Sequence, residues 1–164
     1  MTNNTAFAEL MAHQRQTEAL GKIAERLGWD QETMMPEAAA EQRGEELAAI
    51  EGVLHARRTD PRLADWLDAA QAPDAAGAAI LRELARSYAR SVKIPADLAQ
   101  ELARVTSVAQ GVWAKARAAD RVADFAPTLA RVIDLRRQEA ACLAQGGDLY
   151  DALLDDYEPE ATAQ

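Results

Sequence analysis

Two histidines are the side chains of this sequence best suited to metal chemistry, and their spacing argues against it. His13 stands in the segment HQRQT and His55 in the segment HARRT. A catalytic zinc takes about three protein ligands, usually histidines with a carboxylate. Neither histidine begins an HExxH motif, and helical periodicity assigns the two to different helices. We therefore expect two surface histidines and no metal ligand in this chain.

The remaining reactive side chains also form no complete catalytic arrangement. Cys142 has no evident histidine partner and lies in an apolar stretch, which is typical of a packed thiol. The C-terminal stretch carries four acidic residues of interest, namely Asp151, Asp155, Asp156 and Glu158. Their spacing is not that of a calcium loop, so a solvated acidic surface is expected. No glycine-rich phosphate loop and no GxSxG motif is present, and no catalytic residue is predicted.

The charge of the sequence argues against two kinds of partner. The 164 residues carry a formal net charge of −9, with a pI of about 4.7. Phosphate groups are bound by clustered lysine and arginine. The basic residues here, including Arg57, Arg58, Arg136 and Arg137, are scattered among acids. We therefore expect neither nucleic acid nor an anionic membrane surface as a partner.

The sequence gives no sign of export. The segment MTNNTAFAEL lacks the basic flank and apolar core of a signal peptide. No apolar run reaches the length of a membrane span. A single cysteine excludes an internal disulfide and fits a reducing compartment. The cytoplasm is the expected location.

The elements that would position these side chains are helices. Apolar residues recur at helical spacing throughout, and no segment alternates as a strand does. We expect about six helices in antiparallel hairpins, without a sheet, as one helical region over residues 1–164. The expected helices cover 5–27, which stops at Gly28, and 36–58, followed by a short one from Pro61, one around 80–88, one from Pro95 and one capped by Asp124.

The last two expected helices carry heptad stripes that favour an antiparallel hairpin. The first stripe consists of Leu98, Leu102, Val105, Ala109, Val112 and Ala116. The second consists of Phe125, Leu129, Val132, Arg136, Ala140 and Leu143. One charged residue, Arg136, interrupts the second stripe.

The segment WDQETMM, between the first two expected helices, is too rich in large side chains for a linker. Trp29 could fold back onto the first helix as an apolar plug, and the two methionines could fill gaps between helices. Asp30 or Thr33 could cap a helical turn, and Gln31 and Glu32 could reach backbone groups. These interpretations explain the residues singly but not their occurrence together.

Four segments show a resemblance that covers nearly the whole chain. They are LGWDQETMMPEAAAEQRGEELAAIEGVLHARRTD, IPADLAQELARVTSVAQGVWAKAR, FAPTLARVIDLRRQEA and YDALLDDYEPEAT. In this order they resemble the N-terminal region of the Taq-type thermostable metallocarboxypeptidases. The family often has a further proline or glycines where this chain has Glu37, Ala38 and Ala39, and glycine where it has Glu160. These departures concern local turns.

The resemblance implies a mostly helical, deep-clefted and often dimeric peptidase. Such enzymes release C-terminal residues from peptides with broad specificity and poor tolerance of proline. The family's zinc ligands come from an HExxH helix and a downstream glutamate, and the HExxH glutamate is the general base. This sequence contains none of them. It therefore resembles the N-terminal third alone, expected to be inert without the C-terminal catalytic region and to bind no metal itself.

The resemblance assigns this region to the wall and lid of the cleft. The candidate substrate-binding or cleft-lining residues are Trp29, Asp30, Gln31, Glu32, Met34 and Met35. The same segment could instead pack against the catalytic region. Two other readings stay open, a free-standing helical interaction module without catalysis and a structural bundle that dimerises through its heptad stripes. Apolar surface left uncovered by a missing region favours a homodimer.

Overall fold

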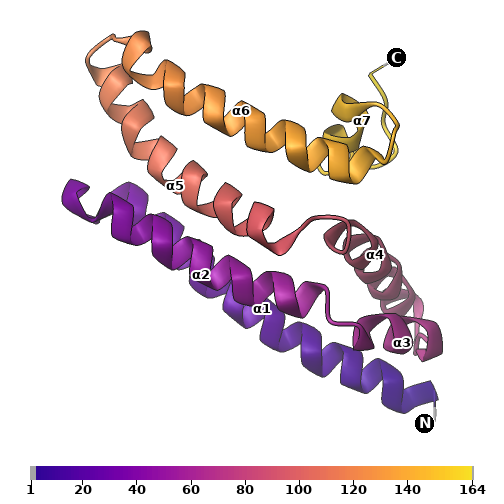
Figure 1. The fold of residues 1–164 in the computed structure, drawn as a ribbon. Helices are drawn as coiled ribbons and strands as arrows, with labels where there is room; N and C mark the ends of the chain where they lie inside the picture. Colours follow the sequence, from indigo (N-terminus) through magenta and orange to yellow (C-terminus); the bar gives the residue numbers. More distant parts are fainter. Residues whose placement is uncertain (1–2, 164) are drawn as a thin grey trace.

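The computed structural model describes residues 3–163, and in this range it consists of helices joined by short turns (Figure 1). No strand occurs among these residues, and the predicted all-α fold is confirmed. The elements are α1 (Asn3–Thr33), the 3-10 helix η1 (Glu37–Ala39), α2 (Ala40–Arg58), α3 (Arg62–Ala69), α4 (Ala75–Ser91), α5 (Ala96–Ala118), α6 (Val122–Ala144) and α7 (Leu149–Leu154).

The long helices pack in chain order, with one insertion. α1 and α2 form an antiparallel pair, α5 lies along α2, and α6 returns along α5. The shorter α3 and α4 lie between α2 and α5 in the chain and sit at one end of the long helices (Figure 1). α7 folds against α6 near the C-terminus. No helix within residues 3–163 combines the length and apolarity that a membrane span requires.

The first helix is longer than the sequence predicts. It passes through Gly28 and ends at Thr33, so the predicted stop at Gly28 is wrong. A glycine inside a helix costs only about 1 kcal/mol, which side-chain contacts of the following turn can offset. Met34 and Met35 then leave the helix, and both backbone N–H groups donate to the carbonyl of Asp30 at 2.9 Å.

Helix α2 approaches α5 closely because a glycine lies at the contact. Gly44 is buried, and a Cβ atom in its place would stand 3.1 Å from Val108 Cγ2 and 3.4 Å from Arg104 Cγ. A larger side chain would push the helices apart or force Val108 to move. The sequence predicts α2 as a helix, but its packing along α5 was not predicted.

The predicted hairpin of α5 and α6 is present, with a different seam on α6. A buried cluster of Leu98, Leu102, Val105 and Leu135 holds the two helices together, and Val132 and Cys142 pack against it. Cys142 is thus a packed thiol, as predicted.

Three details of the α6 prediction are wrong. Leu129 is 42% exposed and Arg136 is exposed, although both belong to the predicted stripe. Leu135, which does not belong to that stripe, is 2% exposed. The helix also begins at Val122, so Asp124 lies in its first turn and does not cap it. Apolar residues on both sides of α6 made the face ambiguous, and only the packing against α5 selects one.

The C-terminal stretch forms a capped turn of helix. Asp148 accepts hydrogen bonds from the N–H groups of Tyr150 and Asp151, at 2.8 and 3.0 Å, at the start of α7. Beyond α7, Glu160 has a φ of +70°, a left-handed conformation that favours glycine. Glu160 is a position where the family often has glycine, and a glutamate in this conformation carries strain.

Glu160→Gly should therefore stabilise this turn by about 0.5 kcal/mol, because relief of the left-handed strain exceeds the added entropy of the unfolded glycine. The reporter is the Glu160 amide, which donates to Asp155 Oδ1 at 3.0 Å. Its hydrogen exchange, corrected for the intrinsic rate, should slow. Glu158→Gly, at an ordinary backbone conformation, should instead speed that exchange. Equal effects of the two variants would contradict the strain argument.

Candidate functional site

The WDQETMM segment occupies the last turn of α1 and the turn that follows it. Asp30 and Gln31 face the neighbouring helices, and Met35 is partly buried. Trp29, Glu32 and Met34 are exposed. The structure therefore divides the six candidate residues into an inner and an outer group.

Asp30 is part of a network centred on the buried Arg43 of α2. The guanidinium group donates to Asp30 Oδ2 at 2.5 Å, to Glu46 Oε2 at 2.9 Å and to the carbonyl oxygen of Leu27. The hydrogen bond to Asp30 is the main cause that raises the pKa of Arg43, and Glu46 adds to it. Asp30 lies inside α1 and caps no helix. It joins the end of α1 to α2.

Gln31 fixes the end of α1 against α5. Its Nε2 donates to the carbonyl oxygen of Ser107 at 2.8 Å, and Ser107 Oγ donates to Gln31 Oε1 at 2.7 Å. The expectation that Gln31 reaches a backbone group is confirmed. Both ends of the amide are used, so its orientation is determined. Ser107 is buried, which makes an unpaired hydroxyl or amide there costly.

Three of the six candidates line one groove. Gln31, Glu32 and Met35 stand on one side, and Val108 and Val112 of α5 on the other, around a cavity of about 450 Å³. A volume of this size accommodates a short peptide segment. The structure thus brings together three of the residues that the sequence selected for cleft lining.

The rim of this groove is acidic. Glu32, Glu37 and Glu41 line it, together with a single cation, Lys115, among the lining residues. Lys115 Nζ lies 2.9 Å from Glu37 Oε2, and both side chains are largely exposed. A solvated pair of this kind contributes little to stability, so a ligand could displace it at small cost.

Trp29 and Met34 do not line the groove. Trp29 is 65% exposed and Met34 71% exposed, so the interpretation of Trp29 as a plug against the first helix is wrong. The reason is that Trp29 lies within α1, where it cannot fold back onto that helix. Thr33 also caps nothing, since its Oγ1 donates to the carbonyl of Trp29 at 2.7 Å.

Both histidines are hydrogen-bonded to backbone carbonyl groups of other segments. His13 is only 8% exposed, so its prediction as a surface residue is wrong, and its ring stacks at a tilt against Trp66. His13 Nε2 donates to the carbonyl of Arg57 at 2.9 Å and His55 Nε2 to that of Ile94 at 2.7 Å. Among the described residues no group of three histidine, cysteine or acidic side chains could hold a metal ion. The residues present therefore do not fit a metal centre.

Two acidic residues of the C-terminal stretch, Asp155 and Asp156, are paired with arginines where the sequence predicts a solvated surface, whereas Glu158 is exposed as predicted. Asp155 Oδ2 lies 2.6 Å from Arg86 Nη2 and 2.9 Å from Arg90 Nη1, and Asp156 lies 2.7 Å from Arg90 Nη2. The N–H of Glu160, and then Arg86, lower the pKa of the Asp155 carboxyl group. The sequence pattern did not predict this pairing because the partner arginines lie on α4, far away in the sequence.

Two residues that organise the site were not predicted. Arg43 stands one helical turn before Leu47 and continues the apolar stripe that Leu47, Ile50 and Leu54 form in the sequence. A charge at such a position is a signal of a buried ion pair. Ser107 gave no comparable signal, because its partner Gln31 lies in another helix.

The sequence is similar to known metallopeptidases over most of its length. The carboxypeptidase Taq (M32) metallopeptidase family matches residues 9–164. Thermostable carboxypeptidase 1 of Thermus thermophilus is 38% identical over 179 residues, covering 100% of this chain and 35% of that protein. The Pyrococcus furiosus protein of the same name is 28% identical over 158 residues, covering 94% of this chain and 32% of its own length. The chain thus spans about a third of the length of these curated relatives.

Solved structures agree in fold. The crystal structure of BsuCP superposes with a TM-score of 0.89 at 20% identity, over 98% of this chain and 33% of that one. Trypanosoma cruzi metallocarboxypeptidase 1 gives a TM-score of 0.73 at 28% identity, again over 98% and 33%. The family match extends over nearly all of the sequence, and the chain therefore belongs to the carboxypeptidase Taq (M32) metallopeptidase family.

Proposed function

We propose that this chain is the N-terminal helical part of a metal-dependent carboxypeptidase that releases C-terminal amino acids from peptides. The proposal rests on the family match over residues 9–164, joined with the third of the relatives' length that the chain spans. In this proposal the metal, zinc or another divalent ion, is held by the C-terminal catalytic region. The chain alone is inert, and the enzyme acts in the cytoplasm with broad specificity and poor tolerance of proline.

In such an enzyme these helices form a wall of the cleft. A peptide must be shielded from water and held so that only its end reaches the reacting centre. The groove beside α5 supports a border role for Gln31, Glu32 and Met35. The exposure of Trp29 and Met34 supports packing against the catalytic region, since exposed apolar groups mark interfaces.

Reading the source gene beyond the codon for Gln164 tests the main proposal first. We expect an open frame that encodes HExxH and a downstream glutamate. The encoded protein should then release C-terminal residues from peptides when loaded with a divalent metal, while the 164-residue chain should not. A stop codon after Gln164 would overturn the proposal and favour a helical interaction module.

Two variants of the metal-loaded full-length protein separate the roles within the segment. Trp29→Ala should lower the melting temperature and leave kcat/KM of the folded fraction unchanged, as expected for interdomain packing. Glu32→Gln should raise KM for peptides and leave the melting temperature unchanged. The reverse pattern would exchange the two assignments.

Dimerisation is proposed as well, and sedimentation of a strict monomer at high concentration would contradict it.

A further inference from the structure

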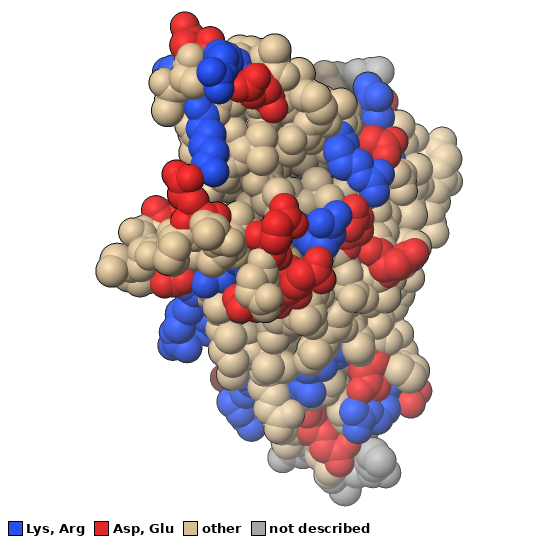
Figure 2. Space-filling model, turned by 60° about the vertical axis from the view of Figure 1, so that its left-hand side comes forward, with Lys and Arg blue, Asp and Glu red and all other residues tan. Residues whose placement is uncertain are grey.

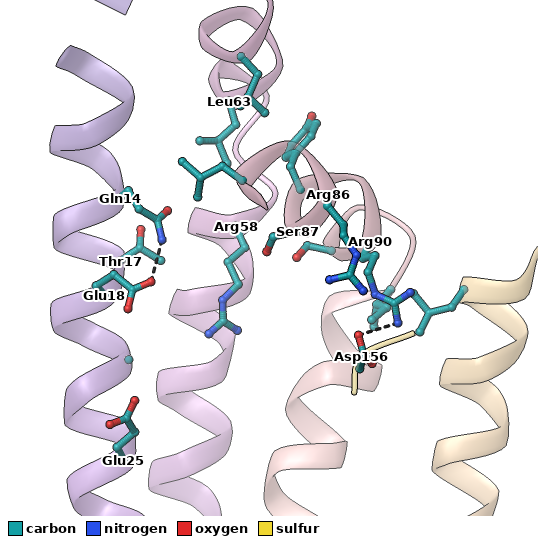
Figure 3. Close-up of a pocket in the computed structure, with 17 residues that line it drawn as sticks. Gln14, Thr17, Glu18, Glu25, Arg58, Leu63, Arg86, Ser87, Arg90 and Asp156 are labelled. Carbon is teal, nitrogen blue, oxygen red and sulfur yellow. Dashed lines mark hydrogen bonds and ion pairs between the residues drawn. The ribbon is translucent and has the colours of Figure 1, made fainter. Parts of the chain in front are cut away.

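A second cavity lies apart from the groove and shares no lining residue with it. It has a volume of about 480 Å³ and lies between the middle of α1, the end of α2, α3 and α4, and the C-terminal stretch. Figure 3 shows α1 with Gln14, Glu18 and Glu25 on one side, α4 with Arg86 and Arg90 on the other, and Arg58 of α2 between them. The volume is in the range of small-ligand sites.

The α1 side of this cavity is acidic. Glu18 Oε1 accepts a hydrogen bond from Gln14 Nε2 at 2.8 Å, and Glu18 has no cationic partner among the described residues. Glu25 faces the same cavity and pairs with Lys22, which is 58% exposed. Solvated pairs of this kind are weak. The α1 side therefore keeps free acceptor capacity for a cation.

The opposite side is basic, but only part of its charge is available. Asp155 and Asp156 already neutralise Arg86 and Arg90. Arg58, which lies between the two sides, also pairs with Glu51, but only its Nη1 is used, at 3.1 and 3.3 Å. Its Nε and Nη2 have no partner within residues 3–163 and can donate to one carboxylate. A planar guanidinium suits such a bidentate contact.

The remaining lining supplies an apolar surface beside these charges. Leu63, Leu67 and Leu84 line the cavity, together with the hydroxyl group of Ser87. A ligand that fits must therefore offer an anionic group, a cationic group and a modest apolar body. A purely anionic ligand would also approach against the net charge of −9, whereas a neutral zwitterion would not.

We propose that this cavity binds a small zwitterion of the amino-acid type, with its α-carboxylate on Arg58 and its α-ammonium group on Glu18. A free amino acid and a dipeptide share this chemistry. The site is distinct from the groove at Gln31, and its existence does not rest on the proposed function. The acidic and basic side chains that Figure 2 shows interspersed over one face do not by themselves define such a site, because the opposed pair must line one cavity.

Titration of the 164-residue chain with leucine and with the dipeptide Ala-Leu, followed by NMR, tests this proposal. We expect saturable chemical-shift changes at the cavity, centred on Glu18, Arg58 and Ser87. The zwitterion whose charge separation matches the distance between Arg58 and Glu18 should bind more tightly. N-acetyl-leucine and leucine amide, which each lack one charge, should bind about tenfold more weakly, as expected when one charge-assisted contact is lost.

Two variants and a control complete the test. Arg58→Gln and Glu18→Gln should each weaken binding by about tenfold, while Arg131→Gln, an exposed arginine of α6, should not change it. Should Arg58→Gln unfold the chain, the exposed Glu18→Gln still decides. Equal binding of leucine and N-acetyl-leucine, or no shifts at the cavity, would overturn the proposal. Because the readout is binding, a failed proposed function would leave this result unchanged.

Discussion

Replacing Arg43 by methionine should lower the free energy of unfolding by about 2–3 kcal/mol. The substitution keeps much of the aliphatic volume but removes every donor from the centre of the α1–α2 network. Asp30, Glu46 and the carbonyl of Leu27 then lose their shared partner. Breaking a fully buried pair costs about 3–5 kcal/mol, but the Asp30 side chain is 41% exposed and can be partly rehydrated. Urea unfolding followed by circular dichroism measures the difference.

The matched control is Arg121→Met. Arg121 also pairs with an acid three residues later, Asp124, at 2.7 Å, but the two side chains are 68% and 49% exposed. Its loss should cost less than about 0.5 kcal/mol. If both variants cost the same, burial adds nothing at Arg43, and the network is not what joins α1 to α2.

The elements of this fold could be predicted from local signals. The heptad stripes of α5 and α6 predict their hairpin, because each stripe must be buried and the connecting turn is short. Gly28 shows where such signals fail. A glycine before a large-residue segment favours a helix stop, yet the bonds of Asp30 to Arg43 and of Gln31 to Ser107 extend the helix past it.

The packing between distant helices was beyond local signals. The contact of α2 with α5 depends on Gly44 opposite Val108, two residues whose relation no periodicity reveals. The pairing of Asp155 was equally beyond local signals, because its partner Arg86 lies on another helix. Local sequence patterns therefore do not identify contacts between residues on distant helices.

The second large effect on stability is expected on the face of α6 that packs against α5. Leu135→Ala should lower the free energy of unfolding by about 3 kcal/mol, the cost of a cavity at a site that cannot collapse. Leu135 is 2% exposed and belongs to the cluster of Leu98, Leu102 and Val105 between α5 and α6. Urea unfolding with circular dichroism measures this value, and the slope should stay constant if the native fold is kept.

The same substitution at Leu129 decides which face of α6 is buried. Leu129 belongs to the stripe that the sequence predicts, together with Arg136, yet it is 42% exposed. Leu129→Ala should therefore cost less than about 1 kcal/mol, since exposed leucine buries little area and alanine is the better helix former. A larger cost at Leu129 than at Leu135 would mean that the hairpin packs through the predicted stripe. The helix would then be rotated about its axis, and the cluster around Leu135 would not be the core that holds it.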